Sequence, residues 1–190
     1  LFVNITIWQT RQKFILFKRE LEGGLEMILR QTKLEDISRV MEIINQAKCY
    51  FKENGIDQWQ DGYPNEETIK RDIEKNEAYV LVDEDQIVGT CMVTINGETS
   101  YNRIDGKWLL NSPYICVHRI AVDSNCKGKG LASTILDQVV AMYPDYHSVR
   151  MDTHNDNLSM QKFLTKYGFK HCGTITLASG ALRRAYEKRI

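Results

Sequence analysis

The chain has 190 residues, with 25 basic and 25 acidic side chains and a formal net charge of zero. This length fits one domain, or one domain with an appendage, better than two full domains. With 43% hydrophobic residues, 26% charged residues and 3 prolines, the composition is that of a globular protein and not of a disordered or fibrous one. Neutrality argues against nucleic acid or an anionic membrane as a partner, and no apolar run reaches the roughly 20 residues of a bilayer span.

The cysteines are spaced too widely for a C-x-x-C motif, which argues against a zinc knuckle and a thioredoxin-type site. We therefore expect no metal, and free, mostly buried thiols. An odd number of cysteines and the lack of a secretory signal favour a reducing compartment, so we expect a cytoplasmic protein. The five cysteines are Cys49, Cys91, Cys116, Cys126 and Cys172.

The first 26 residues differ from the rest of the chain. A short β-like run (1–8) and a basic amphipathic run (11–22) end at Gly23-Gly24, and the regular pattern begins at Met27. We interpret residues 27–190 as the domain. Residues 1–26 are then an N-terminal extension, either a remnant of expression or upstream translation or an arm that pairs with a second subunit.

The first half of this domain predicts a strand, two helices and a hairpin. Residues 27–30 form a short strand, and Thr32 with Glu35 resembles a helix start. Apolar residues spaced by three and four predict a helix from residue 34 to about 54. A polar and aromatic connector (56–64) leads to a helix capped by Asn65 that ends near 75. Strands at 78–82 and 87–95 flank a tight turn.

The second half alternates strands and helices. A polar loop (96–112) precedes a strand at 114–122, and Gly128 and Gly130 open a helix with an apolar face. A strand at 149–152, a helix at 158–167 and strands at 170–177 and 182–188 follow. This order predicts an α/β fold with a mixed, partly antiparallel central sheet flanked by helices.

The turn before the helix at 130 has the features of an anion-binding loop. Gly128 and Gly130 leave backbone N–H groups accessible at a helix N-terminus, and Lys127 and Lys129 add positive charge. A Walker loop is disfavoured because no Lys-Ser/Thr follows the second glycine. A dinucleotide fingerprint is disfavoured because Ser133 stands where a third glycine is needed.

With its strand and helix, this loop resembles the acetyl-CoA pyrophosphate loop of the GNAT family of N-acetyltransferases, whose pattern is [RQ]-x-x-G-x-[GA]. Lys127, Gly130 and Ala132 occupy the three defined positions, and the lysine departs from the usual Arg or Gln. Residues 152–169 resemble the family's strand, asparagine, helix and Gly-Phe segment. The resemblance covers about residues 27–189 and implies the acetyl-CoA N-acyltransferase type of fold.

The resemblance implies transfer of an acetyl group from acetyl-CoA to a primary amine of a small molecule or protein, by direct attack in a ternary complex. Backbone groups of Ile120, Ala121 and Val122 would hold the acetyl and pantetheine arm. Asn155 or Asn157 would also bond that arm, with Met160 and Phe163 packed nearby. The pyrophosphate would be bound by the backbone of Lys127, Gly128, Lys129, Gly130, Leu131, Ala132 and Ser133.

The general base cannot be assigned from the resemblance alone. Relatives often carry a Glu where this chain has Cys116, and a thiol is a poor substitute at neutral pH. His118 shares that strand face, and its ordinary pKa near 6.5 suits a base. The alternative is that His118 is a hydrogen-bonded core residue. Further candidates are Glu53, Asp57 and Asp61.

The general acid is equally open. Relatives often have a Tyr where Leu164 stands in this chain. Tyr186 is the candidate that we name, since Tyr167 is expected to face the core. Otherwise the thiolate leaves without a protein acid.

The acceptor pocket is expected between the first helix, the connector and the last two strands. Trp59 and Tyr63 are its expected walls, or else two aromatic residues that pin a loop. Residues 53–85 hold eleven acidic and three basic side chains, a net −8 that would attract a cationic amine.

Two other functions are alternatives to acetyl transfer. One is a non-catalytic acyl-CoA-binding or regulatory module, and the other, disfavoured by the loop spacing, is a P-loop nucleotide binder. Relatives often form homodimers.

Overall fold

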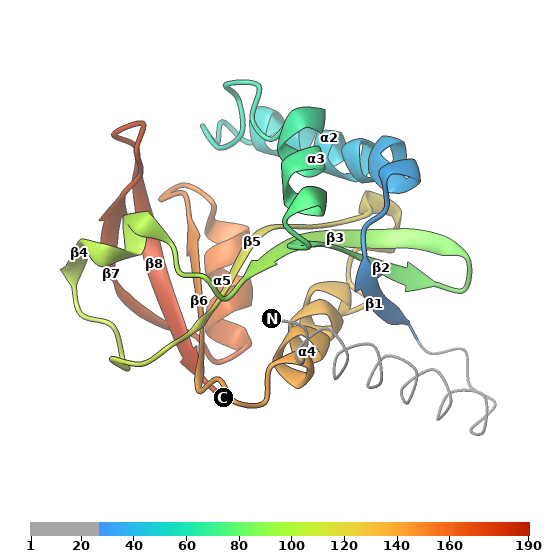
Figure 1. Cartoon of the computed structure of the whole chain (residues 1–190). Helices are drawn as coiled ribbons and strands as arrows, with labels where there is room; N and C mark the ends of the chain where they lie inside the picture. Colours follow the sequence, from blue (N-terminus) through green and yellow to red (C-terminus); the bar gives the residue numbers. More distant parts are fainter. Residues whose placement is uncertain (1–26) are drawn as a thin grey trace.

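The computed structural model describes residues 27–190, so the extension expected at 1–26 lies outside the described residues. In that part of the chain, eight strands form one sheet in the order β1-β2-β3-β5-β6-β8-β7-β4 (Figure 1). Only β5 and β6 pair in parallel, and the other neighbours are antiparallel. The expected mixed sheet is confirmed. The strands are β1 Ile28–Gln31, β2 Ala78–Asp83, β3 Gln86–Thr94, β4 Ile104–Gly106, β5 Ile115–Val122, β6 Ser148–Thr153, β7 Lys170–Thr176 and β8 Leu182–Arg189.

Helices cover both faces of the sheet (Figure 1). α2 (Ile37–Glu53) and α3 (Glu66–Glu74) pack on one face, and α4 (Leu131–Met142) and α5 (Leu158–Lys166) pack on the other. Three 3-10 turns join these elements: η1 (Leu34–Asp36), η2 (Thr99–Asn102) and η3 (Ser124–Cys126). Among residues 27–190, no helix combines the length and the apolar character that crossing a membrane requires.

The buried faces of the helices follow from the spacing of their apolar residues. In α2, Ile37, Val40 and Ile44 return to the same side at three- and four-residue intervals and are buried against the sheet. In α4, Leu131, Ile135 and the residues one turn further on are buried in the same way on the other face. These two helices therefore pack on opposite faces of β5.

The start of the first helix differs from the expectation. Thr32 and Glu35 do not cap it. Instead, Asp36 accepts a hydrogen bond from the backbone N–H of Lys33 (2.7 Å) and pairs with Arg30. The 3-10 turn before the helix brings the side-chain oxygen of Asp36 back to Lys33. The capping residue is therefore Asp36 and not Glu35. The expected cap of α3 is confirmed, since Asn65 accepts from the backbone N–H of Thr68 (3.0 Å).

The expected loop 96–112 contains regular structure that the sequence pattern did not predict. Besides η2, it holds β4, which pairs with β7 at the edge of the sheet. Gly106 faces Gly173 there, and a Cβ on either would lie about 2.2 Å or less from a backbone oxygen of the other strand. Two opposed glycines thus permit a close approach of the two backbones. A strand of three residues is too short to show the alternation by which strands are recognised.

The sheet opens between its two parallel strands. β5 and β6 pair only at Ile115 with Val149 and at Cys116 with Arg150. Beyond these pairs the strands diverge, as Figure 1 shows. A bulge lies in the diverging part of β5: the pairing with β3 shifts between His118 and Ala121, and Arg119 has a φ of 52°. The gap that results leads into a cavity of the described surface.

Candidate active site

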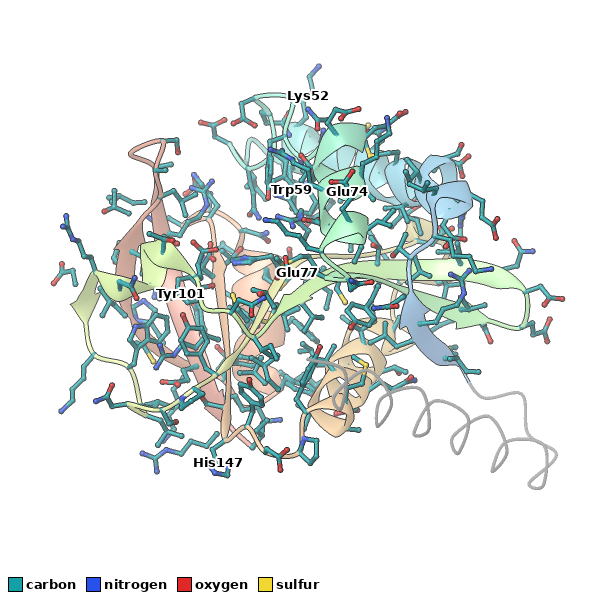
Figure 2. The ribbon with its side chains drawn as sticks, in the orientation of Figure 1. Lys52, Trp59, Glu74, Glu77, Tyr101 and His147 are labelled. Atoms are coloured by element: carbon teal, nitrogen blue, oxygen red, sulfur yellow. The ribbon has the colours of Figure 1, made fainter. Side chains whose placement is uncertain are left out.

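A cavity of about 450 Å³ lies over the gap between β5 and β6. Its walls come from the connector between α2 and α3, the segment before η2, the diverging parts of β5 and β6, the start of α5 and the turn between β7 and β8. In Figure 2, Trp59 lies on the side of α2 and α3, and Tyr101 lies toward β4 and β7. Residues that line the cavity include Asp57, Gln58, Trp59, Asp61, Tyr63, Glu98, Ser100, His118, Arg119, Ile120, Met151, Asp152, Thr153, Asn157, Met160 and Arg183.

His118 lies on the floor of this cavity between two carboxylates. Its Nε2 is 3.3 Å from Oε2 of Glu98, and its Nδ1 is 3.6 Å from Oδ1 of Asp152. The sulfur of Cys116 lies 3.1 Å from Nε2, so the two residues share a strand face as expected. Burial lowers the pKa of His118, but the Cys116 sulfur and the two carboxylates outweigh burial and raise this pKa well above 6.5. These contacts favour the protonated form of the ring.

Glu98 is the carboxylate that the sequence analysis missed. Its Oε1 accepts hydrogen bonds from the backbone N–H (3.1 Å) and the hydroxyl (2.9 Å) of Ser100, which leaves Oε2 to face His118. The contact with His118 is the main cause that holds the pKa of Glu98 at about 2. No spacing in the sequence links Glu98 to His118, because Glu98 lies in the loop after β3, at the start of the 3-10 turn η2.

The connector forms one wall of the cavity. Trp59 and Tyr63, the expected pocket walls, both line it, and so do Asp57 and Asp61. Glu53 does not line it. The hydroxyl of Tyr63 accepts a hydrogen bond from Arg119, the bulge residue, which also pairs with Asp72 of α3. Arg119 therefore neutralises Asp72, one carboxylate of the acidic stretch 53–85. The exposed Asp57 and Asp61 remain on the cavity wall.

Gln58 connects this wall to the end of β6. Its Oε1 accepts from Nδ2 of Asn157 at 2.9 Å and, at 3.4 Å, from the hydroxyl of Thr153 and the N–H of His154. Asn157 also caps α5 by accepting from the N–H of Met160 (3.1 Å). Of the two expected arm-binding asparagines, Asn157 lines the cavity and Asn155 does not.

The two α5 residues expected to pack near the pantetheine arm lie in different surroundings. Met160 lines the cavity, whereas Phe163 packs against Tyr167 with a ring-centroid distance of 5.9 Å. Of the expected strand-end residues, Ile120 lines the cavity, Ala121 belongs to the core under α2, and Val122 packs toward α4. Their backbone forms the edge of β5 that faces the gap.

The glycine loop presents free donors at the start of α4. Gly128 and Gly130 have φ values of 82° and 76°, a conformation that side chains disfavour. Among residues 27–190, the backbone N–H groups of Gly128, Gly130, Leu131 and Ala132 have no acceptor. Four such groups at a helix N-terminus form a site for an anion such as phosphate.

The other three expected loop residues use their N–H groups inside the loop. Lys127 donates to the carbonyl of Ser124 and Lys129 donates to that of Cys126, both at 3.4 Å. Ser133 donates to the carbonyl of Gly130 at 2.9 Å. The ammonium group of Lys127 lies 4.5 Å from the ring centroid of Tyr50 in α2. Of the seven residues 127–133 expected to bind the pyrophosphate, four therefore have a backbone N–H group that is free within the described part of the chain.

The expected proton donor lies on the wrong side of the sheet. Tyr186 pairs with Met151 across β6 and β8 and belongs to the core under α4 and α5, opposite the face that carries His118. It does not line the cavity. Leu164 is fully buried, and the hydroxyl of Tyr167 donates to Asp137. The alternation of strand residues explains the error, because the face of a late strand cannot be assigned before its register is known.

Comparison with known proteins agrees with this geometry. A sequence model described as the acetyltransferase (GNAT) family matches residues 40–169. No match was found among curated proteins. The crystal structure of a GNAT-family acetyltransferase from Streptococcus agalactiae superposes with a TM-score of 0.80 at 33% identity, over 88% of this chain and 99% of that one.

More distant structures show the same fold. A GNAT-family acetyltransferase from Listeria monocytogenes is 20% identical, with a TM-score of 0.66 over 88% of this chain and 97% of that chain. Ard1 from Thermoplasma volcanium is 16% identical, with a TM-score of 0.63 over 86% and 97% of the two chains.

Proposed function

Since the chain belongs to the acetyltransferase (GNAT) family, we propose that it transfers the acetyl group of acetyl-CoA to a primary amine of a small molecule or protein, by direct attack in a ternary complex. The observation that carries this proposal is that the chain places three features in order: the free N–H groups of the α4 start, the gap between β5 and β6, and the cavity that contains His118.

Acetyl-CoA fits the residues of these three features. The N–H groups of Gly128, Gly130, Leu131 and Ala132 would bind the pyrophosphate, since they are free donors at the positive end of a helix. The unpaired edge of β5 at residues 120–122 would bond the amide-rich arm in the manner of a neighbouring strand. When bound, acetyl-CoA supplies an electrophilic thioester carbon.

The cavity residues would bind the amine and take its proton. Asp57 and Asp61 give the connector wall negative charge, which favours an ammonium group over an anion. His118 is the ring on the cavity floor that can accept the amine proton once it is itself neutral. Tyr186 has no role in this proposal, because it faces the opposite core.

A non-catalytic acyl-CoA-binding module is the second candidate. Cys116 and the fully buried Leu164 stand where relatives often carry the catalytic Glu and Tyr. The same three features would then bind acyl-CoA without turnover.

Calorimetry with acetyl-CoA, followed by an assay of thiol release with a panel of primary amines, tests both candidates. We expect binding and amine-dependent release of CoA, with turnover lost in His118→Ala and kept in His154→Ala, a histidine outside the lining of the cavity. Binding without turnover by any amine would favour the non-catalytic module. Failure to bind acetyl-CoA would refute both.

A further inference from the structure

His118 lies between two carboxylates, an arrangement that a general base does not by itself need. The three side chains come from separate segments: Glu98 from the loop after β3, His118 from β5 and Asp152 from β6. All three line the cavity, and their side chains are between 10% and 31% exposed. Two carboxylates with one imidazolium leave one negative charge at the cavity floor.

Each carboxylate is held in place by a second group. Ser100 holds one oxygen of Glu98 through two hydrogen bonds. The hydroxyl of Tyr101 donates to Oδ1 of Asp152 at 2.7 Å, and the ring of Tyr101 lies 5.9 Å from that of His118. These bonds orient both carboxylates toward the ring, with Glu98 3.3 Å from Nε2 and Asp152 3.6 Å from Nδ1. This geometry favours the doubly protonated ring over either neutral tautomer.

The same geometry gives a reason why a bound cation would change the ring. Glu98 faces the cavity with the oxygen that pairs with His118, so an ammonium group entering the cavity meets this carboxylate. A positive charge there competes with the imidazolium for Glu98 and repels it. Both effects favour loss of the proton from His118.

We propose that Glu98 and Asp152 hold His118 as an imidazolium in the resting site, and that a small aliphatic primary ammonium acceptor, by pairing with Glu98, releases the ring proton and makes His118 the base. The Nε2–H bond breaks first, and that proton leaves to solvent through the cavity. An N–H bond of the ammonium then breaks as a new Nε2–H bond forms, which leaves a neutral amine and an imidazolium. Glu98 and Asp152 act as positioning residues. This inference rests on the proposed function.

The groups in direct contact with the ring come from four segments. Cys116 contacts the ring from β5, Tyr101 from η2, Glu98 from the loop and Asp152 from β6. Arg119 follows His118 in β5, but it pairs with Asp72 and Tyr63 on the other side of the bulge. Among the described residues, the groups that favour the imidazolium are therefore the two carboxylates and the thiol.

The test measures the titration of His118 by NMR in the purified protein without acetyl-CoA, with its signal assigned from His118→Asn. We expect a pKa well above 6.5 that falls by about 1 or more in Glu98→Gln and in Asp152→Asn. The control is Asp156→Asn, which removes an exposed carboxylate 3.6 Å from His154 and should leave His118 unchanged. A His118 pKa at or below 6.5, or one that Glu98→Gln does not move, would overturn the inference.

A second measurement uses the unaltered protein, so that it does not depend on the folding of a variant. n-Propylammonium chloride is titrated against sodium chloride at equal ionic strength and against n-propanol. We expect only the ammonium to lower the pKa of His118, and an unchanged pKa would overturn the role of the acceptor. Since neither experiment uses acetyl-CoA, a protein that shows both shifts but no acetyl transfer would refute the proposed function and leave the carboxylate pair standing.

Discussion

Replacing Glu187 with Ala is expected to cost the protein a large part of its stability, because it leaves a buried positive charge without its carboxylate partner. Glu187 in β8 is fully buried and accepts from Nε of Arg150 in β6 at 3.0 Å. It also accepts from the backbone N–H groups of Leu109 and Leu110. The carboxylate therefore joins two strands to the segment that precedes β5.

The expected loss follows from the surroundings of Arg150. Its side chain is 7% exposed, and its guanidinium lies 4.2 and 4.0 Å from the ring centroids of Trp108 and Tyr114. Removing one partner of such a buried pair typically costs about 3–5 kcal/mol. For a domain of this size, each kcal/mol lowers the melting temperature by about 2–4 °C, so a decrease of about 6–20 °C is expected.

Urea unfolding followed by far-UV circular dichroism measures this loss. Glu187→Gln is the matched variant: it keeps an acceptor for the two N–H groups, so it should lose less stability than Glu187→Ala. Glu67→Ala breaks the exposed pair with Lys70 and should leave the midpoint unchanged. Equal midpoints for Glu187→Ala and Glu67→Ala would refute the reasoning that burial of the charge decides the cost.

Three further predictions concern the site. Gly130→Ala, at a φ of 76°, should strain the loop and raise the Kd for acetyl-CoA about tenfold. Gly55→Ala, at a φ of 66° after α2, is the control and should leave this Kd unchanged. Equal Kd values for the two variants in calorimetry would contradict this. Gln58→Ala removes three hydrogen bonds between the connector and residues 153–157, so limited proteolysis should cleave the connector faster. Gln60→Ala should increase the rate of cleavage less. The reverse order of the two rates would contradict the role of Gln58 in holding the connector. Since the pKa of Glu98 falls from 4.5 to about 2 on folding, its contribution to stability is present above pH 4.5 and lost as the pH falls toward 2. Glu98→Gln should flatten that part of the curve of urea midpoint against pH, and an unchanged slope would argue against the ion pair.

Most of the fold could be predicted from periodicity and caps. The helices α2, α4 and α5 and all strands except β4 lie within a few residues of their expected bounds, because their apolar spacing follows the period of the element. β4 escaped because its pairing depends on two opposed glycines 67 positions apart in the sequence, Gly106 and Gly173. Such long-range register leaves no local signal.

The candidate site could be predicted where it depends on local backbone and not where it depends on register. The loop at Gly128 and Gly130 was recognised because a strand, a glycine turn and a helix start follow one another directly. Glu98, the partner of His118, was not predicted, since it reaches the ring from the loop that starts η2. The position of Tyr186 in the core under α4 and α5 was not predicted for the same reason. Side chains that meet across a sheet are set by pairing, which the sequence alone leaves open.

The opening between β5 and β6 also makes this sheet two four-stranded sheets joined at one short seam. Strands β1, β2, β3 and β5 lie on one side and β6, β8, β7 and β4 on the other, connected by two residue pairs. Each half therefore exposes an inner edge, and an open edge invites pairing with a strand of another molecule. Charged side chains beside an edge oppose such pairing, and His118, Arg119 and Asp152 occupy those positions. His118 and Asp152 thus belong to the candidate site and also place polar side chains beside the two inner edges.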